Sequence, residues 1–201
     1  MKGKLIAFEG CDGSGLSTQA ALASKWLRKK GYDVLETKEP TNNFIGQVIR
    51  SILKKEIKAD QKTLQLLFCA DRAHHLGSEI IPALETGKIV ITDRYVMSTL
   101  AFGSLDLEAD WLKKLNEKFP RPDLTIIIDV PEKVSVKRIV KSRPKTELFE
   151  DVKKLENVRK SYHELSKEFP NTVIIDGTKS IENVFSQVEN AINALLRQNK
   201  G

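Results

Sequence analysis

The chain alternates short, continuously apolar runs with longer segments in which apolar residues recur at helical spacing. The apolar runs, which end in glycine, proline or polar residues, are Leu5–Gly10, Asp33–Pro40, Lys88–Tyr95, Asp123–Val130 and Thr172–Gly177. Short runs of this kind predict buried strands. Because helical segments separate them, we expect an α/β fold with a five-stranded parallel sheet that helices cover on both faces.

Helical spacing predicts helices at Ser17–Lys30, at 44–55, at 60–86 and from about 181 to 198. The helix at 60–86 is the longest, and we expect an interruption near Pro82. Further helices are expected in the remaining gaps between strands.

The 201 residues, 40% of them hydrophobic, predict one domain spanning residues 1–201. The first residues lead directly into a predicted strand, and no apolar run reaches the roughly 18 residues that span a bilayer. We therefore expect a cytoplasmic protein without a membrane partner. The net charge of +6 comes from basic residues spread along the whole chain, so we expect no nucleic-acid partner either. Cys11 and Cys69 fit no metal spacing and are expected to be reduced thiols.

Acidic residues stand late in the predicted strands or directly after them. Glu9, Asp93 and Asp129 occupy such positions, and Glu39 follows another strand. In parallel α/β sheets, ligands bind beyond the carboxyl ends of the strands. The sequence therefore predicts its functional site at this edge of the sheet.

A glycine-rich segment follows the first strand and opens the first helix. It matches the phosphate-loop pattern G-x-x-x-x-G-K-[ST] at Gly10, Gly15 and Ser17, but Leu16 replaces the lysine. The glycines allow backbone N–H groups to converge on phosphate, and the helix directs its positive end there. The alternative is a glycine-rich turn that binds nothing. The residues predicted to bind ATP phosphates are Gly10, Asp12, Gly13, Ser14, Gly15, Leu16, Ser17 and Thr18.

The replacement of this lysine by Leu16 is expected to affect phosphoryl transfer more than phosphate binding. The usual lysine supplies a positive charge to the terminal phosphates. Loss of one such group costs about 3 kcal/mol or more of transition-state stabilisation, which is roughly a hundredfold in rate. The sequence leaves three explanations open: another cation takes this role, turnover is poor, or the leucine was introduced to trap a complex.

Several motifs, taken in order, resemble those of thymidylate kinase. They are the phosphate loop, Lys38–Thr41, Leu67–Arg72, Asp93–Tyr95, Ser98 and Ala101–Gly103. The resemblance implies a P-loop NTPase-type three-layer α/β/α fold. It also implies transfer of a phosphoryl group from ATP to dTMP with Mg²⁺, in a homodimer that packs through residues near 60–80.

Phe68 and Arg72 are four residues apart, so they share one helix face. A flat ring beside a planar guanidinium suits a pyrimidine base. The resemblance implies that the two side chains stack on thymine and hydrogen-bond to it. The alternative is a core Phe beside a surface Arg that pairs with Asp71.

The resemblance implies that Arg94 binds the acceptor phosphate and that Asp93 lies near the magnesium ion. Ser17 would offer its hydroxyl to the same ion. The alternative for the first two is a buried ion pair between them, which is costly without a function. Arg94, Asp93 and Arg143 are the predicted catalytic residues.

The resemblance also assigns further acceptor-site residues: Asp12 at the sugar 3′-hydroxyl, Glu39 and Pro40 shaping the pocket, Arg50 at the phosphate, and Tyr95, Ser98 and Phe102 around the nucleoside. Arg50 could equally be a solvated surface residue, and the two aromatic residues could be plain core residues. Gly103 stands where the family often carries Gln or Thr, so the base preference is less secure.

A short basic segment at about 141–150 resembles the family's lid over ATP. Arg143, with Lys141 or Lys145, could replace the charge that Leu16 lacks. Arg138 matches an arginine that packs on adenine, or else lies on a helix surface. Two other functions remain open: a kinase for another nucleoside monophosphate, and a nucleotide-binding relative with little catalysis.

Overall fold

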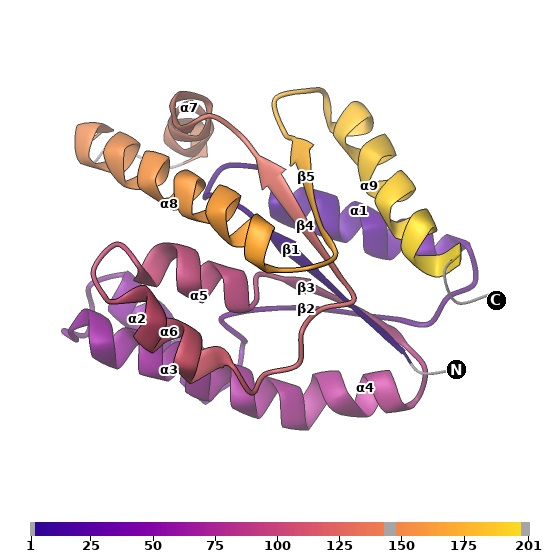
Figure 1. The fold of residues 1–201 in the computed structure, drawn as a ribbon, viewed down its shortest axis with the longest axis horizontal. Coiled ribbons are helices and arrows are strands. Elements are labelled where there is room, and N and C mark those ends of the chain that lie inside the picture. The colour runs from indigo at the N-terminus through magenta and orange to yellow at the C-terminus, as the bar shows by residue number, and fades with distance from the viewer. Residues whose placement is uncertain (1–2, 143–147, 198–201) are drawn as a thin grey trace.

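The computed structural model describes residues 3–142 and 148–197. They form one parallel five-stranded sheet with the strand order β2-β3-β1-β4-β5 (Figure 1). The strands are β1 Lys4–Glu9, β2 Val34–Lys38, β3 Ile89–Asp93, β4 Leu124–Asp129 and β5 Thr172–Asp176. Four of them lie within the runs predicted from sequence and β1 begins one residue before its run, at Lys4, so the predicted parallel α/β sheet is confirmed.

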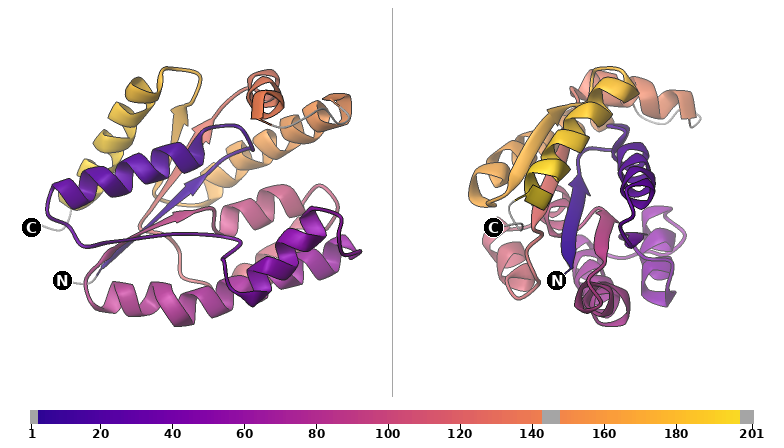
Figure 2. Two further views of the ribbon diagram at one scale, coloured as in Figure 1. Left: turned by 180° about the vertical axis from the view of Figure 1, so that it is seen from behind. Right: turned by 90° about the vertical axis from the view of Figure 1, so that its right-hand side faces the viewer.

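Helices lie on both sides of the sheet. Two of them, α1 (Leu16–Lys29) and α9 (Ile181–Arg197), pack together on one side, and the view from behind shows α1 in front of the strands (Figure 2). The remaining helical elements are α2 Phe44–Leu53, α3 Gln61–His75, η1 Leu76–Ile80, α4 Ile81–Glu85, α5 Val96–Gly103, α6 Ala109–Asn116, α7 Glu132–Ser142 and α8 Leu148–Glu168. Together they give the expected three-layer arrangement.

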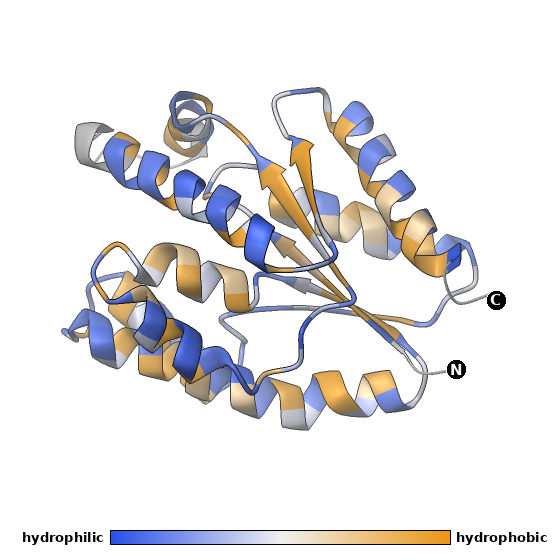
Figure 3. Cartoon of the chain, in the orientation of Figure 1, coloured by the Kyte–Doolittle hydropathy of each residue, from blue (hydrophilic) through white to orange (hydrophobic). Residues whose placement is uncertain are grey.

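The alternation of side chains along β1 divides the hydrophobic core in two. Leu5 and Ala7 pack in one cluster with residues of α5 and α8, whereas Ile6 and Phe8 pack in another with α1 and α9. Successive side chains of a strand point to opposite faces, so one apolar strand supplies both clusters. Figure 3 shows the resulting band of hydrophobic residues through the central strands. This rigid centre fixes the strand ends at which the site is expected.

The edge strand β5 is less covered than predicted. Val173 and Ile174 are each more than a third exposed, while the central strands β1 and β4 are buried along nearly their whole length. Helices α8 and α9 both contact β5, so helices flank this edge as well but cover it less fully than the centre of the sheet. Within the described ranges, no helix is long and apolar enough to cross a membrane.

The long helix expected at 60–86 is divided into three pieces. A five-residue π-helical turn, η1, separates α3 from α4, and Pro82 stands in the first turn of α4. The chain stays helical through this junction, because the N–H of Ile81 donates to the Leu76 carbonyl and Pro82, which has no N–H, takes the next position. The interruption therefore begins at Leu76, ahead of the proline that was expected to cause it.

Candidate functional site

The segment between β1 and α1 curls through three left-handed glycines. Gly10, Gly13 and Gly15 have φ values of 149°, 76° and 95°. A Cβ on Gly13 would lie 2.7 Å from the carbonyl oxygen of Ser135, so the loop is also held closely against α7. Only glycine accepts this combination without strain. The structure thus places the glycines of the phosphate-loop pattern where the backbone needs them.

The first turn of α1 leaves its backbone donors free for a ligand. Its N-cap is Gly15, which provides no side-chain cap, and the first turn holds no acidic residue. The first backbone bond into the helix runs from the Gln19 N–H to the Gly15 carbonyl. Ser17 and Thr18 are exposed at this end. Free N–H groups at the positive end of a helix form an anion-binding site.

The Leu16 side chain is turned into the protein. It is only 5% exposed and packs in the hydrophobic cluster that α1 and α9 share with the sheet. Leu16 therefore brings its backbone N–H to the loop, while its side chain belongs to the core. The sequence alone identified the missing charge but not this packing role.

Arg94 follows β3 and reaches the mouth of the loop. Strands β1 and β3 are neighbours, with Phe8 opposite Asp93, which is the arrangement on which this placement depended. The Arg94 guanidinium donates to the Gly10 carbonyl at 2.9 Å and to the Asp12 carboxylate at 2.7 Å. Its side chain is 19% exposed and that of Asp12 is 62% exposed, so the cation remains accessible to a ligand.

The alternative of a buried pair between Asp93 and Arg94 is wrong, because Asp12 is the carboxylate that Arg94 contacts. The left-handed backbone of Arg94, with φ of 70°, accompanies this turn of the chain toward the loop. Asp93 is half-buried at the end of β3, and its carbonyl accepts from the N–H of Glu39.

The oxygen donors expected to meet a metal ion form a sparse set. They are the Ser17 hydroxyl and the Asp93 carboxylate, and no cluster of three or more His, Cys, Asp or Glu in the described residues could hold an ion alone. Mg²⁺ is typically bound through one or two protein oxygens together with substrate phosphates and water. The two residues therefore fit an ion that arrives with a polyphosphate.

A buried carboxylate lies behind Arg94. Glu9 is 1% exposed and accepts hydrogen bonds from the Tyr95 N–H at 3.0 Å, from the Ser98 hydroxyl and from the Tyr162 hydroxyl at 3.2 Å. Burial raises the pKa of Glu9 above its ordinary value. Arg94 also donates to the Ser98 hydroxyl at 3.1 Å. Ser98, predicted to contact the acceptor, thus belongs to a cluster at the phosphate loop that also contains Glu9 and Arg94.

Tyr162 belongs to this cluster although sequence reasoning missed it. It comes from α8, 153 positions after Glu9, and its ring meets that of Phe102 edge to face with centroids 6.4 Å apart. Phe102 in turn lies 5.2 Å from the Arg94 guanidinium. The only sequence signal at Tyr162 is helical spacing, which any core aromatic residue would share.

Arg72 lies in a second, closed cluster. It is 1% exposed, and its guanidinium contacts the Glu39 carboxylate at 2.8 and 2.9 Å. It also donates to the side-chain oxygens of Asn116 and Thr99. Three of its five N–H donors thus make hydrogen bonds within the protein, and its contact with a base stays a prediction.

The alternative of a surface Arg72 paired with Asp71 is wrong. Asp71 instead accepts from the backbone N–H of Thr41 at 2.7 Å and from its hydroxyl at 2.6 Å. Phe68 is half-buried on α3 one turn before Arg72, as the spacing predicted. A contact between the Phe68 ring and a base likewise stays a prediction.

Tyr95 is a core aromatic residue in this structure. It is 1% exposed, its hydroxyl donates to the Pro120 carbonyl at 3.0 Å, and its ring lies 5.2 Å from the Arg72 guanidinium. Its backbone N–H reaches Glu9, so Tyr95 connects the two clusters. A role in walling the nucleoside stays a prediction.

Arg50 holds the chain that follows β2. It donates to the Pro40 carbonyl at 2.8 Å and also to the Thr41 carbonyl. The Glu39–Pro40 peptide bond is cis. Arg50 is therefore not a merely solvated residue, and its contact with an acceptor phosphate is untested.

Arg138 lies against the phosphate loop. Its guanidinium donates to the Ser14 carbonyl at 3.1 Å and to the Gly177 carbonyl at 2.9 Å. It joins the loop to the turn after β5 and is not a free helix-surface residue. Arg143 lies outside the described residues, as do 144–147 of the predicted lid.

A third ionic group lies at the end of β4, where sequence pattern pointed to Asp129 but missed its partners Arg159 and His163. Asp129 receives two bonds from Arg159, at 2.7 and 2.8 Å, and lies 3.2 Å from His163 Nε2. Partial burial by itself would raise the pKa of Asp129. The contact with Arg159 outweighs this effect and holds the pKa of Asp129 below its ordinary value. Arg159 and His163 also line a charged cavity of about 400 Å³ on α8.

Gly103 has a packing reason in this structure. A Cβ there would lie 2.9 Å from Leu112 Cδ1 and 3.1 Å from Gln65 Cδ. The larger residues that the family often carries would not fit without movement of these neighbours. Gly103 is therefore explained by local packing and gives little information on the preferred acceptor base.

Comparisons with known proteins agree with the resemblance. A family model described as thymidylate kinase matches residues 8–188. A probable thymidylate kinase from Pyrococcus horikoshii is 42% identical over 194 residues, which cover 94% of this chain and 95% of the relative. Thymidylate kinases from Desulfotalea psychrophila and Caldicellulosiruptor saccharolyticus are 39% and 37% identical, with alignments covering 97% and 98% of this chain and 96% and 100% of theirs.

Proposed function

The chain belongs to the thymidylate kinase family, and we propose that it transfers the terminal phosphoryl group of ATP to dTMP, giving dTDP and ADP. The observation that carries this proposal is the placement of Arg94 at the mouth of the uncapped phosphate loop. A donor phosphate on the loop and an acceptor phosphate on Arg94 would then be adjacent. Phosphoryl transfer depends mainly on such positioning and on charge neutralisation.

On the donor side, the N–H groups around Gly13 to Thr18 bind the phosphates of ATP. Arg138 supports this loop from behind through the Ser14 carbonyl. On the acceptor side, Arg94 exchanges part of its contact with Asp12 for the phosphate of dTMP, and Asp12 becomes free for the sugar hydroxyl. The Asp12 side chain is 62% exposed, which permits this exchange.

Ser17 and Asp93 would hold Mg²⁺ together with the phosphates. Once bound, the ion would neutralise part of the charge on the β- and γ-phosphates. Asp93 is half-buried at the end of β3, one residue before Arg94, so donor and acceptor groups come from adjacent positions. Since Leu16 is packed in the core, further positive charge at the loop has to come from other side chains. Within the described residues, Arg94 and Arg138 donate hydrogen bonds to the loop.

A glycine substitution tests the loop directly. Gly13→Ala would force a left-handed residue against the Ser135 carbonyl, and we expect a loss of ATP binding of at least tenfold by calorimetry. The matched control is Gly77→Ala, where a Cβ meets nothing within 4 Å. The proposal fails if the unmodified protein binds neither ATP nor dTMP, or if both glycine variants bind ATP equally well.

A coupled assay tests the reaction and its acceptor. The protein is assayed with ATP and each of dTMP, dUMP, UMP and dGMP, and we expect the highest kcat/KM for dTMP. A higher value for another monophosphate would make the protein a kinase for that nucleotide. Absence of turnover with all four would favour a nucleotide-binding relative.

We further propose a cytoplasmic homodimer. Large apolar side chains are exposed on α2, α3 and α4 and on the turn after α2: Phe44, Leu53, Ile57, Leu66 and Ile81. Such residues suit a self-complementary interface. Light scattering should give a dimer mass for the unmodified protein and a monomer mass for Leu66→Lys. Ile181→Lys, on α9, is the matched control and should remain dimeric.

A further inference from the structure

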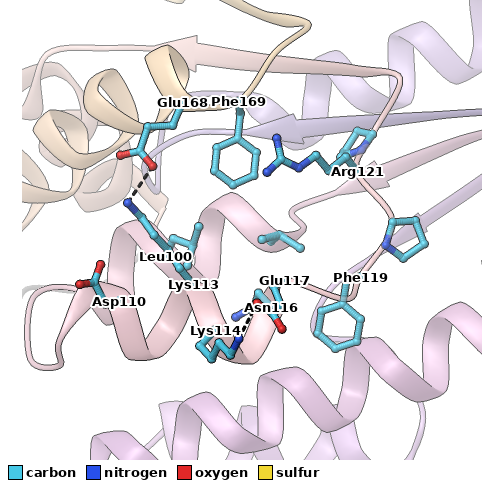
Figure 4. A pocket seen from close by; sticks show the side chains of 13 residues that line it. Leu100, Asp110, Lys113, Lys114, Asn116, Glu117, Phe119, Arg121, Glu168 and Phe169 are labelled. Carbon is cyan, nitrogen blue, oxygen red and sulfur yellow. Dashed lines mark hydrogen bonds and ion pairs between the residues drawn. The ribbon is translucent and has the colours of Figure 1, made fainter.

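A second hollow lies away from the phosphate loop. A cavity of about 310 Å³ opens between α5, α6, the segment 117–122 that leads into β4, and Phe169, which precedes β5 (Figure 4). Because this segment precedes β4 and Phe169 precedes β5, the cavity faces the amino ends of the strands. The phosphate loop occupies the carboxyl ends. The cavity is therefore separate from the site described above.

The lining of the cavity combines apolar and charged side chains. The apolar ones are Val96, Leu100, Phe119, Pro120, Pro122 and Phe169, and the charged ones, called the rim below, are Asp110, Lys113, Lys114, Glu117, Arg121 and Glu168. Two lysines of the rim are already neutralised, since Lys113 pairs with Glu168 at 2.7 Å and Lys114 with Glu117 at 3.0 Å. These pairs leave little net charge on that part of the rim.

Arg121 and Asp110 remain as the unbalanced charges. The Arg121 guanidinium lies 5.2 Å over the Phe169 ring, and no carboxylate in the described ranges pairs with it. Asp110 also lacks an ion-pair partner among those residues, and Figure 4 shows it at the opposite end of the cavity from Arg121. A ligand with an apolar body and a single negative group would therefore enter with that group toward Arg121.

We propose that this cavity binds a planar aromatic carboxylate of one or two rings. Its volume is at the lower end for small-molecule pockets, which suits such a ligand. The ring would pack on Phe119 and Phe169, and the carboxylate would receive paired hydrogen bonds from Arg121. Asp110 would repel a second negative group, so a dicarboxylate would bind more weakly.

The wall of the cavity continues into the Arg72 cluster. Asn116 accepts from the Arg72 guanidinium, the Phe119 ring lies 5.5 Å from it, and the Pro120 carbonyl accepts from the Tyr95 hydroxyl. A ligand that shifts residues 116–120 therefore changes the surroundings of Arg72 and Tyr95. We infer that occupancy of the cavity alters the affinity for dTMP, an inference that rests on the proposed function.

Calorimetry with naphthalene-2-carboxylate, in the absence of nucleotides, tests the site. We expect saturable binding of one molecule per chain, weakened about tenfold or more in Arg121→Ala and for the uncharged naphthalene-2-methanol. Arg28→Ala, which removes another exposed arginine far from the cavity, should bind the carboxylate normally. Absence of saturable binding, or equal binding by Arg121→Ala, overturns the site. Arg121 is exposed, and a thermal melt verifies that its variant is folded.

The coupling has its own test. The Kd of dTMP is measured with and without saturating naphthalene-2-carboxylate, and we expect a change of about fivefold or more. Thermodynamic reciprocity requires dTMP to change the Kd of the probe by the same factor. An unchanged Kd overturns the coupling while the site stands. Failure of dTMP to bind without the probe would instead overturn the proposed function, so the two failures are distinguishable.

Discussion

Arg94, directly after β3, and Arg72, within α3, are both arginines of the candidate site, but they differ in exposure to solvent. Arg94 is partly exposed, and its carboxylate partner Asp12 lies largely in solvent. Arg72 is buried and contacts Glu39, Asn116 and Thr99. The first arginine can exchange a protein partner for a ligand at small cost. The second would have to break a desolvated network.

This difference indicates that Arg94 is available to bind substrate, whereas Arg72 stabilises the folded structure around the pocket. We expect Arg94 to act mainly on the rate of phosphoryl transfer and Arg72 mainly on folding stability. The following predictions would break or sharpen that distinction.

The largest effect is expected for Arg72→Ala. The substitution leaves the Glu39 carboxylate buried beside His75 without its arginine, and we expect a loss of about 3–5 kcal/mol in the free energy of unfolding. Urea unfolding followed by circular dichroism measures it. Arg28→Ala, which breaks an exposed pair with Glu36, should cost at most about 1 kcal/mol. Similar losses in both variants would contradict a buried network.

Arg94→Ala should lower kcat/KM for dTMP by roughly 100- to 1,000-fold, as expected for the loss of one preorganised charge. Its free energy of unfolding should change less than that of Arg72→Ala, because Asp12 can be hydrated. The coupled assay and urea unfolding, applied to the same preparations, give both values. An Arg94 variant with normal kcat/KM would end the assignment of Arg94 to the acceptor phosphate.

Leu16→Lys should act on rate and stability in opposite directions. A lysine at this position has to turn out of the core to bring its ammonium to the loop, and with the ammonium there we expect a gain of about tenfold or more in kcat. Loss of the buried leucine should cost about 1.5–3 kcal/mol of stability. Leu16→Ala is the control, with a stability loss and no gain in rate. If kcat for Leu16→Lys stays unchanged, arginines already supply sufficient charge.

The smallest effect concerns pH. Burial raises the pKa of Glu9 in the folded protein, so the folded state holds this proton more tightly than the unfolded state does. The contribution of Glu9 to the stability should therefore fall as pH rises from the unfolded pKa of about 4.3 toward the raised folded pKa. Glu9→Gln should remove this fall, which amounts to about 1.4 kcal/mol for every tenfold gain in proton affinity on folding. Parallel pH–stability curves for the two proteins would show that Glu9 titrates normally.

The fold and the phosphate loop could be predicted from sequence because both depend on local pattern. Apolar runs mark the strands, and the glycines mark the loop between β1 and α1. The partners of Arg94 could not be predicted in this way. Asp12 is 82 positions away and Tyr162 is 68 positions away, and only strand order and the packing of α8 bring them together.

The burial of Arg72 was also beyond sequence reasoning. The side of α3 that is buried carries Gln65, Asp71, Arg72 and His75, which a hydrophobicity pattern assigns to solvent. Asp71, Arg72 and His75 can be buried because Thr41, Asn116 and Glu39 supply hydrogen-bond partners from other elements. A pattern of polar residues cannot show whether its partners come from water or from the protein.

Helix α5 has a consequence for how acceptor preference can evolve. Its consecutive residues Ser98 and Thr99 contact Arg94 and Arg72 respectively. Adjacent positions on a helix differ in direction by about 100° and cannot be moved separately. A mutation that reorients α5 to admit a different base would therefore also displace the phosphate ligands. Descendants with new specificity should arise through paired substitutions on either side of this helix, and single changes should mostly lower activity.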